Sequence, residues 1–403
     1  MREYTPFTPG QRVPLDLFVG RANTIEKIMD YIKRPAAGGQ EHIFLSGERG
    51  IGKTSLAQYL TGPVQREANL LPVHVNLGGV TSLEEMLRRV FEEVLNVANA
   101  RPWFDKVRDL FGKYVDHVDV FGVKLAFNPP GESLGHLVSH FHEALYNIME
   151  RIKDESEGLF IVLDDINGLA KDDRFANWYK GFVESASMRY ERFPVVFVLV
   201  GLPKIRSALN EHQPSLMRVF RVAEVSKLSD AEVERFFEKA FAKVECTVEP
   251  EAMERMVSLS GGFPILMQEI GDAIYRTDSD HTINEDDALA GCNEAAVAIG
   301  EKHLEQKVYR AIQSEGYMSI LRKMGRKGSI WFRKKDMLLE LGDSEKRVFD
   351  NFLTKMKRLG VIIPFREMGS GCYKFANPLY MLYVMLESKG TLPKMSRKPP
   401  QDK

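Results

Sequence analysis

The sequence predicts an α/β fold with a doubly wound parallel sheet. Apolar runs typical of buried strands alternate with helical stretches along the first half of the chain, at residues 42–46, 74–77, 159–163 and 195–201. This alternation favours parallel strands joined by crossover helices that cover the sheet. A glycine-rich loop also separates the first strand from the helix that follows it. Both observations predict a nucleotide-binding core of roughly 220 residues, larger than an average domain.

The glycine-rich loop, Gly-Glu-Arg-Gly-Ile-Gly-Lys-Thr at residues 47–54, matches the phosphate-binding motif G-x-x-x-x-G-K-S/T at every fixed position. Its glycines let backbone N–H groups turn toward phosphate oxygens, and the next helix adds its dipole. Lys53 supplies a charge for the β- and γ-phosphates and is catalytic, while Thr54 supplies a hydroxyl for Mg²⁺. The predicted nucleotide-binding residues here are Gly47, Arg49, Gly50, Ile51, Gly52, Lys53, Thr54 and Ser55.

Two aspartates follow the apolar run at residues 159–163. Ligands of parallel sheets bind at the carboxyl ends of the strands, so Asp164 and Asp165 stand where a second half of the site is needed. We assign Asp164 to the Mg²⁺ shell and Asp165 to positioning or deprotonating the attacking water. The alternative is a plain Asp-Asp turn at the end of a strand.

The segment Leu-Phe-Val-Gly-Arg at residues 17–21 resembles the F-V-G-R box of AAA+ and related STAND ATPases. With the loop, the aspartate pair and Gly-Gly-Phe-Pro at residues 261–264, the resemblance covers the ATPase core and a helical lid. It implies ATP as the ligand, Phe18 and Val19 beside the adenine, and Pro264 at the base or ribose. The alternative for residues 261–264 is a turn that separates two lid helices.

Two departures from the AAA+ pattern concern hydrolysis. Many AAA+ proteins have Asp-Glu where this chain has two aspartates, a pair that is more typical of STAND switches. The shorter side chain reaches less far, which predicts either slow hydrolysis or a differently placed water. Residues 265–270, in the helix after Pro264, contain no arginine, so the arginine that many AAA+ proteins direct at the γ-phosphate is missing from its usual place. Residues 216–221 resemble a segment in which an arginine acts across a subunit interface. Arg218 is our first choice for this arginine finger and Arg221 the second; the alternative is a surface arginine before an edge strand.

An insert at about residues 115–130 interrupts the core. Polar and apolar residues alternate around Gly122, and Pro129-Pro130-Gly131 follows. This pattern predicts a β-hairpin. The hairpin either contacts a partner or nucleic acid, or covers the edge of the sheet.

The C-terminal region differs in charge from the rest of the chain. Residues 1–301 contain 33 Lys and Arg and 46 Asp and Glu, whereas residues 302–375 contain 17 and 8. The net charge of −1 for the whole chain therefore combines an acidic part with a basic part. Such asymmetry indicates an anionic partner for the basic part.

The basic region has the pattern of helices followed by a two-stranded wing. We expect helices at 304–313, 334–341 and 345–359, the last capped by Ser344, and strands at 361–365 and 372–375. This order resembles a winged-helix domain, whose last helix enters the major groove of double-stranded DNA. The candidate DNA-binding residues are Arg322, Lys323, Arg326, Lys327, Lys346, Arg347, Lys355, Lys357 and Arg358. The alternative is a protein-docking domain with a solvated basic face.

The predicted domains are an ATPase core (1–224), a helical lid (225–300), a winged helix (301–388) and a disordered tail (389–403). No stretch has the 18 or more apolar residues of a membrane span, so we expect no membrane contact. The three cysteines lie far apart in sequence and suggest neither a zinc site nor a disulfide framework, which fits the cytoplasm.

These observations favour an ATP-dependent switch that acts on double-stranded DNA, with ATP and Mg²⁺ bound between core and lid at a subunit interface of a homo-oligomer. The competing hypothesis is a STAND-like signalling ATPase that oligomerises on ATP and recruits a partner protein. Salt-sensitive DNA binding by the basic region distinguishes the two.

Overall fold

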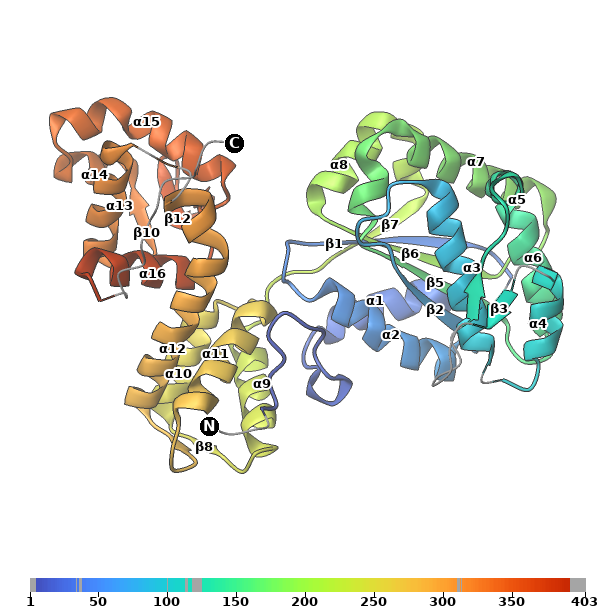
Figure 1. Cartoon of the computed structure of the whole chain (residues 1–403), viewed down its shortest axis with the longest axis horizontal. Coiled ribbons are helices and arrows are strands. Elements are labelled where there is room, and N and C mark those ends of the chain that lie inside the picture. The colour runs from blue at the N-terminus through green and yellow to red at the C-terminus, as the bar shows by residue number, and fades with distance from the viewer. Residues whose placement is uncertain are drawn as a thin grey trace. The chain divides into compact units, whose positions relative to one another are not determined.

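The computed structural model describes residues 5–33, 35, 38–99, 101–112, 115–117, 125–309, 312 and 314–391. The chain forms two compact units, one of residues 20–226 and one that combines residues 1–19 with residues 227–403 (Figure 1). The predicted domain limits remain predictions, and most of the predicted tail, residues 392–403, lies outside the described residues. Within the described ranges, no helix is both long enough and apolar enough to cross a membrane.

The first unit is built on a five-stranded parallel sheet in the order β2-β5-β6-β1-β7. The strands are β1 (Glu41–Ser46), β2 (Leu70–Asn76), β5 (Gly158–Asp164), β6 (Val195–Gly201) and β7 (Phe220–Glu224). The predicted α/β class is confirmed, but the prediction of four strands was wrong. The fifth strand, β7, lies at an edge and contains exposed Arg221 and Glu224 beside buried Phe220, so it lacks the continuous apolar run of the central strands.

Helices cover both faces of this sheet, as a doubly wound fold requires (Figure 1). One face carries α1 (Ala22–Lys33) and α2 (Lys53–Glu67). The other carries α3 (Leu83–Asn99), α6 (Phe141–Ile152), α7 (Asp173–Arg189) and α8 (Pro203–His212), with α4 (Phe104–Phe111) and α5 (Gly131–Ser139) packed beside them.

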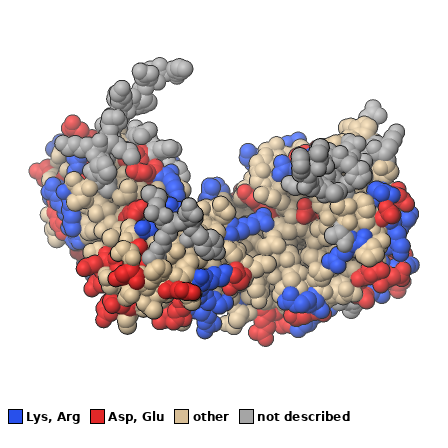
Figure 2. All heavy atoms as spheres, turned by 60° about the horizontal axis from the view of Figure 1, so that its bottom comes forward, with Lys and Arg blue, Asp and Glu red and all other residues tan. Residues whose placement is uncertain are grey.

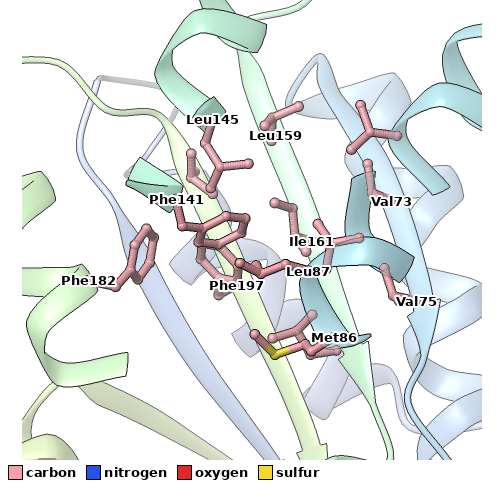
Figure 3. Close-up of a cluster of buried hydrophobic side chains, with 14 of the residues drawn as sticks. Val73, Val75, Met86, Leu87, Phe141, Leu145, Leu159, Ile161, Phe182 and Phe197 are labelled. Atoms are coloured by element: carbon pink, nitrogen blue, oxygen red, sulfur yellow. The ribbon is translucent and has the colours of Figure 1, made fainter. Parts of the chain in front are cut away.

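The larger hydrophobic core lies under α3, α6 and α7 (Figure 3). Val73 and Val75 of β2 and Leu159 and Ile161 of β5 point into it, and Leu87 of α3 belongs to the same cluster. Side chains of a strand alternate between the two faces of the sheet. The intervening residues of β2 and β5 therefore point to the opposite face, toward α2, and this alternation positions the site described below.

The insert forms a short antiparallel hairpin of β3 (Val115–His117) and β4 (Leu125–Phe127). Residues 118–124, which include the predicted central glycine, lie outside the described residues. Phe127 is fully buried, and its ring lies 5.6 Å from that of Phe91 and 5.2 Å from that of Phe111. The described part of the insert thus extends the hydrophobic core through Phe127, and its two predicted roles remain predictions.

The second unit begins with a helical part made of α9 (Asp230–Ala242), α10 (Pro250–Ser260), α11 (Pro264–Thr277) and α12 (Glu285–Gly300), with the short parallel pair β8 (Thr247–Val248) and β9 (Thr282–Ile283). Phe7 inserts among Phe236, Phe237 and Phe241, with ring centroids 5.1 to 6.5 Å apart. The N-terminal segment is therefore part of this core, which the sequence did not indicate.

The basic region contains α13 (Glu315–Lys327), β10 (Trp331–Arg333), α14 (Lys334–Glu340), α15 (Asp343–Arg358), β11 (Ile362–Pro364), β12 (Cys372–Phe375) and α16 (Pro378–Lys389). Its strands form an antiparallel sheet in the order β10-β12-β11. A π-helix at Glu301–Tyr309 overlaps the first part of the helix predicted at 304–313.

One helix of this region begins earlier than predicted. Ser344 does not cap α15, because it lies inside the first turn of a helix whose N-cap is Gly342. The carboxylate of Glu345 accepts a hydrogen bond from the Gly342 backbone N–H at 2.7 Å. A glutamate in the first turn thereby satisfies the N-cap backbone, and no hydroxyl is needed for that purpose.

Candidate functional site

The phosphate-binding loop joins β1 to α2 through backbone conformations that only glycine adopts easily. Gly50 and Gly52 have φ values of 76° and 89°. A side chain at Gly47 would place its Cβ 2.9 Å from the carbonyl oxygen of Val225. Gly52 is the N-cap of α2 and no side chain caps this helix. The positive end of the helix dipole therefore lies at the loop, where an anion is favoured.

Lys53, the first residue of α2, folds back over the loop. Its Nζ donates hydrogen bonds to the carbonyl oxygens of Gly47 at 2.8 Å and Glu48 at 2.9 Å. Burial lowers the pKa of Lys53, while the carboxylates of Asp164, Glu48 and Asp165 act in the opposite direction. The side chain thus holds a cation inside the curve of the loop, where the motif requires it.

The structure brings together the two side chains predicted to hold Mg²⁺. Thr54 Oγ1 donates a hydrogen bond to Asp164 Oδ1 at 3.1 Å, although the residues are 110 positions apart in sequence. Asp164 is the last residue of β5 and only 3% of it is exposed. A hydroxyl and a carboxylate are the oxygen ligands that Mg²⁺ accepts in nucleotide sites. The residues present therefore fit this ion.

A histidine that the sequence did not indicate completes the surroundings of Asp164. His74 of β2 lies 3.1 Å from Asp164 Oδ2 through Nε2. The contact follows from the β2–β5 register, in which His74 is opposite Val162 and Asn76 is opposite Asp164. A residue two positions before the end of a neighbouring strand shares the face of the strand-ending aspartate. That alternation is the signal that could have identified it.

Asp165, the predicted catalytic carboxylate, occupies a left-handed backbone conformation with φ of 63° at the start of the 3₁₀ turn η4 (Ile166–Lys171). The Asn167 side-chain amide donates a hydrogen bond to Asp165 Oδ1. The side-chain oxygen of Asn167, Oδ1, accepts a hydrogen bond from the Leu202 backbone N–H at 3.3 Å. Asn167, also missed from sequence, therefore ties Asp165 to the end of β6. The role of Asp165 in hydrolysis remains a prediction.

The box at residues 17–21 contributes a buried arginine. Arg21 has φ of 65°, is 8% exposed, and donates hydrogen bonds to the carbonyl oxygens of Ile51 in the loop and Ser226, the latter at 2.9 Å. It therefore fixes the loop to the end of this unit, a role that the sequence did not reveal. Phe18 and Val19 belong to the second unit, and their contacts with adenine remain predictions.

The Gly-Gly-Phe-Pro stretch forms the turn between α10 and α11. Gly261 and Gly262 have φ values of 54° and 75°, and a Cβ at Gly262 would lie 2.4 Å from the carbonyl oxygen of Leu228. Pro264 is the first residue of α11, a position that suits its missing N–H. This geometry agrees with the helix-separating alternative, and the contact of Pro264 with nucleotide remains a prediction.

The two candidate finger arginines differ in their surroundings. Arg218 ends the 3₁₀ turn η5 (Pro214–Arg218) and is exposed. Arg221 lies on β7, 3.4 Å from Glu41 Oε1 and above the ring of Tyr31. Arg218 is therefore the better candidate for a contact with another molecule, and its role remains a prediction.

The basic residues of α13 are largely paired with acidic groups of the same region. Lys323 is 2.6 Å from Glu345 Oε2, Lys327 pairs with Glu340, and Arg322 Nε is 4.0 Å from Glu387 Oε1. Burial tends to raise the pKa of Glu345, but hydrogen bonds from Lys323, Ser319 and the Gly342 N–H lower it overall. These predicted DNA-binding residues thus stabilise the domain itself, with exposed Arg326 as the remaining member of the group.

The basic residues of α15 are more accessible. Lys346, Arg347, Lys357 and Arg358 are exposed, and Lys355 is half-buried. No ion pair involves these five side chains in the part of the chain that the structure describes, and Lys357 lies 5.8 Å from the centre of the Tyr373 ring. Both signs of charge are interspersed on the face of the molecule in Figure 2.

Comparison with known proteins identifies the domain that holds this site. Residues 17–180 match the family model of the AAA ATPase domain. The fold resembles that of the ORC2 protein from Aeropyrum pernix in its ADPNP-ADP complexes, with a TM-score of 0.58, 16% identity and 97% of each chain covered. It also resembles the Walker-type ATPase PABY2304 of Pyrococcus abyssi, with a TM-score of 0.53, 15% identity, and 91% of this chain and 96% of that chain covered.

A search of curated protein sequences gave no match. The two structural likenesses agree with the α/β P-loop fold predicted from sequence. The match of residues 17–180 to the AAA ATPase domain confirms the predicted enzyme class, an ATPase.

Proposed function

We propose that this protein is an ATP-dependent molecular switch that acts on double-stranded DNA through its C-terminal basic region. The observation that carries the proposal is the presence, in one chain, of an AAA ATPase domain and of a long helix, α15, with four exposed basic side chains and no ion pair to them among the described residues. Exposed, unpaired cations attract the phosphate backbone of DNA, which dominates nucleic-acid affinity.

Each residue of the site has a separate role in the proposed hydrolysis of ATP. The glycine loop and the N-terminus of α2 bind the phosphates, and Lys53 neutralises charge on the β- and γ-oxygens. Thr54 and Asp164 are the residues that would hold Mg²⁺, which when bound neutralises phosphate charge. Asp165, oriented by Asn167, positions the water whose oxygen bonds to the γ-phosphorus as the bond to the β–γ bridging oxygen breaks, giving ADP and phosphate.

The element order of the basic region supports the winged-helix prediction. A helix, a strand, two helices and an antiparallel hairpin follow one another as α13, β10, α14, α15, β11 and β12, with β10 joined to the hairpin. In a winged helix the last helix before the hairpin enters the major groove. Here that helix is α15, the one with the exposed basic face.

We further propose that the protein acts as an oligomer in which Arg218 of one subunit reaches the nucleotide of the next. Exposed Arg218, at the end of η5, supports this role. The expected consequence is that Arg218→Ala lowers the turnover of assembled subunits only. Equal loss at a dilution that separates the subunits would contradict the proposal.

The test is the ATPase rate with and without double-stranded DNA, at about 50 and 200 mM salt. We expect slow basal turnover, stimulation by DNA, and loss of that stimulation at the higher salt. Lys53→Ala is the control, because it removes the phosphate-binding charge and should abolish both rates. A flat rate with ATP-dependent assembly would contradict the DNA proposal and indicate a signalling ATPase that recruits a partner protein.

A further inference from the structure

His74 occupies a position that only the folded sheet reveals. It lies on β2 and is separated from Asp164 by 90 residues in sequence, yet both side chains point to the face of the sheet that α2 covers. The two side chains are 7% and 5% exposed. A polar pair this deeply buried is stable only when its members satisfy one another.

The contact with Asp164 defines which ring nitrogen of His74 carries the proton. A carboxylate oxygen only accepts hydrogen bonds, so the proton must lie on Nε2 of His74, which donates to Asp164 Oδ2 at 3.1 Å. The other ring nitrogen, Nδ1, is buried and has no hydrogen-bond partner within the described residues. Within the described residues, the His74 ring therefore has its hydrogen bond with Asp164.

Asp164 is held through both of its oxygens. His74 binds Oδ2, and Thr54 Oγ1 binds Oδ1 at 3.1 Å. The carboxylate torsion of aspartate is intrinsically broad, so hydrogen bonds rather than rotamer preference fix its plane. Because Oδ2 of Asp164 binds His74, Oδ1 faces the hydroxyl of Thr54. Thr54 and Asp164 are the two residues predicted to bind the same Mg²⁺ ion.

We propose that His74 is a positioning residue that orients Asp164 for Mg²⁺. The inference rests on the proposed metal-binding role of Thr54 and Asp164. Hydrogen-bond partners of metal-ligating carboxylates typically contribute about 10- to 100-fold to metal affinity. Loss of the histidine N–H removes one of the hydrogen bonds that orient the plane of the Asp164 carboxylate. The effect therefore falls on the metal ion rather than on nucleotide binding by the loop.

The experiment measures binding rather than turnover, with the full chain and a fluorescent ADP analogue. Affinity is measured first in EDTA, and MgCl₂ is then titrated to find the concentration that gives half of the Mg²⁺-dependent change. His74→Phe and His74→Leu both remove the donor, so either one suffices if the other fails to fold. His74→Gln is the matched control, because it retains an N–H donor of similar reach.

We expect His74→Phe and His74→Leu to keep the affinity measured in EDTA and to raise the Mg²⁺ midpoint about 10-fold or more. His74→Gln should recover most of that loss. An unchanged midpoint in the donor-free variants, beside a normal wild-type titration, would overturn the role of His74 alone. A wild-type protein whose nucleotide binding ignores Mg²⁺ would overturn the metal assignment of Thr54 and Asp164, and this inference with it.

Discussion

At the carboxyl edge of the parallel sheet, Asp164 is 3% exposed and each of its oxygens has a side-chain partner. On α15, Lys346 and Arg347 are exposed and form no ion pair with the described residues. Both regions are proposed to bind phosphate groups, one on a nucleotide and one on DNA. The first holds its groups in fixed positions before the ligand arrives, and the second leaves them in solvent.

This difference in burial determines how much a single residue contributes to the binding of phosphate groups. A fixed, buried polar group acts at full strength because little water screens it, and its removal leaves a partner unsatisfied. An exposed cation is screened by salt and contributes a small part of a sum. We therefore expect large effects from single substitutions at the sheet edge and small effects, additive along the helix, on α15.

The strongest test on the buried side is Asp165→Asn. The amide cannot accept a proton from water, so hydrolysis should fall about 100-fold or more, while ATP binding stays within a few-fold of wild type. Single-turnover hydrolysis and fluorescent-nucleotide binding measure the two quantities separately. Loss of binding instead of turnover would mean that Asp165, not Asp164, belongs to the metal shell.

Asp164→Asn is the matched control for this substitution. It changes the same kind of group one residue earlier, at the carboxylate that Thr54 and His74 hold. It should weaken the Mg²⁺-dependent part of nucleotide binding, which Asp165→Asn should leave intact. If both variants behave alike, the division of roles between the two aspartates is wrong.

The sequence was sufficient where the signal is local. The glycine loop and the aspartate pair were found because each consists of a few residues next to a strand, and the structure places Thr54 beside Asp164 as expected. His74 and Asn167 were missed because their roles depend on which strands become neighbours. His74 meets Asp164 only through the pairing of β2 with β5, and Asn167 meets Leu202 only at the end of β6.

The same reasoning explains the errors in the fold. The central strands were recognised as continuous apolar runs, whereas β7 contains exposed charged residues and was considered only as the edge strand in the alternative for Arg218. Phe7 lies in a proline-rich segment without periodicity, and its packing against Phe236 and Phe241 is a tertiary contact. Ser344 is a good N-cap by composition, but the carboxylate of Glu345 already satisfies the backbone of Gly342.

The second prediction concerns a buried histidine elsewhere in the sheet. Tyr179 lies 2.8 Å from Nδ1 of His42, and Gln40 Oε1 lies 3.1 Å from Nε2. The amide oxygen can only accept, so Nε2 donates to it and the tyrosine hydroxyl donates to Nδ1 of a neutral ring. Burial lowers the pKa of His42 from 6.5 to about 3. Between about pH 3 and pH 6.5, His42 is therefore protonated in the unfolded chain and neutral in the folded chain.

The free energy of unfolding should therefore decrease as the pH falls below 6.5, with a contribution from His42 of about 1.4 kcal/mol per pH unit. His42→Gln should show a shallower decline over this range. Urea unfolding at several pH values measures it, with Trp103 and Trp178 reporting on the unit of residues 20–226 and Trp331 replaced by Phe in every protein.

Phe197→Leu provides the control for His42. Its ring stacks on the histidine with centroids 5.8 Å apart, so the substitution lowers stability but retains the ionisable group. Its curve should lie below that of wild type and run parallel to it. A His42→Gln curve that also runs parallel would show that His42 does not cause the acid sensitivity.

The smallest expected effect separates α15 from α13. Arg347 on α15 is exposed and forms no ion pair with the described residues, whereas Arg322 on α13 faces Glu387 at 4.0 Å. Arg347→Ala should weaken DNA binding about 3-fold at moderate salt and reduce the slope of log K against log salt by about one, as expected for the loss of one phosphate contact.

Arg322→Ala should leave that slope unchanged, because its guanidinium lies beside a carboxylate of the same domain. Both substitutions remove one positive charge, so a simple dependence on net charge would move the two slopes equally. Fluorescence anisotropy of a labelled duplex over a range of salt concentrations distinguishes the cases. Equal changes would mean that DNA responds to the overall charge of the domain, and the contrast between the exposed helix and the paired helix would lose its functional meaning.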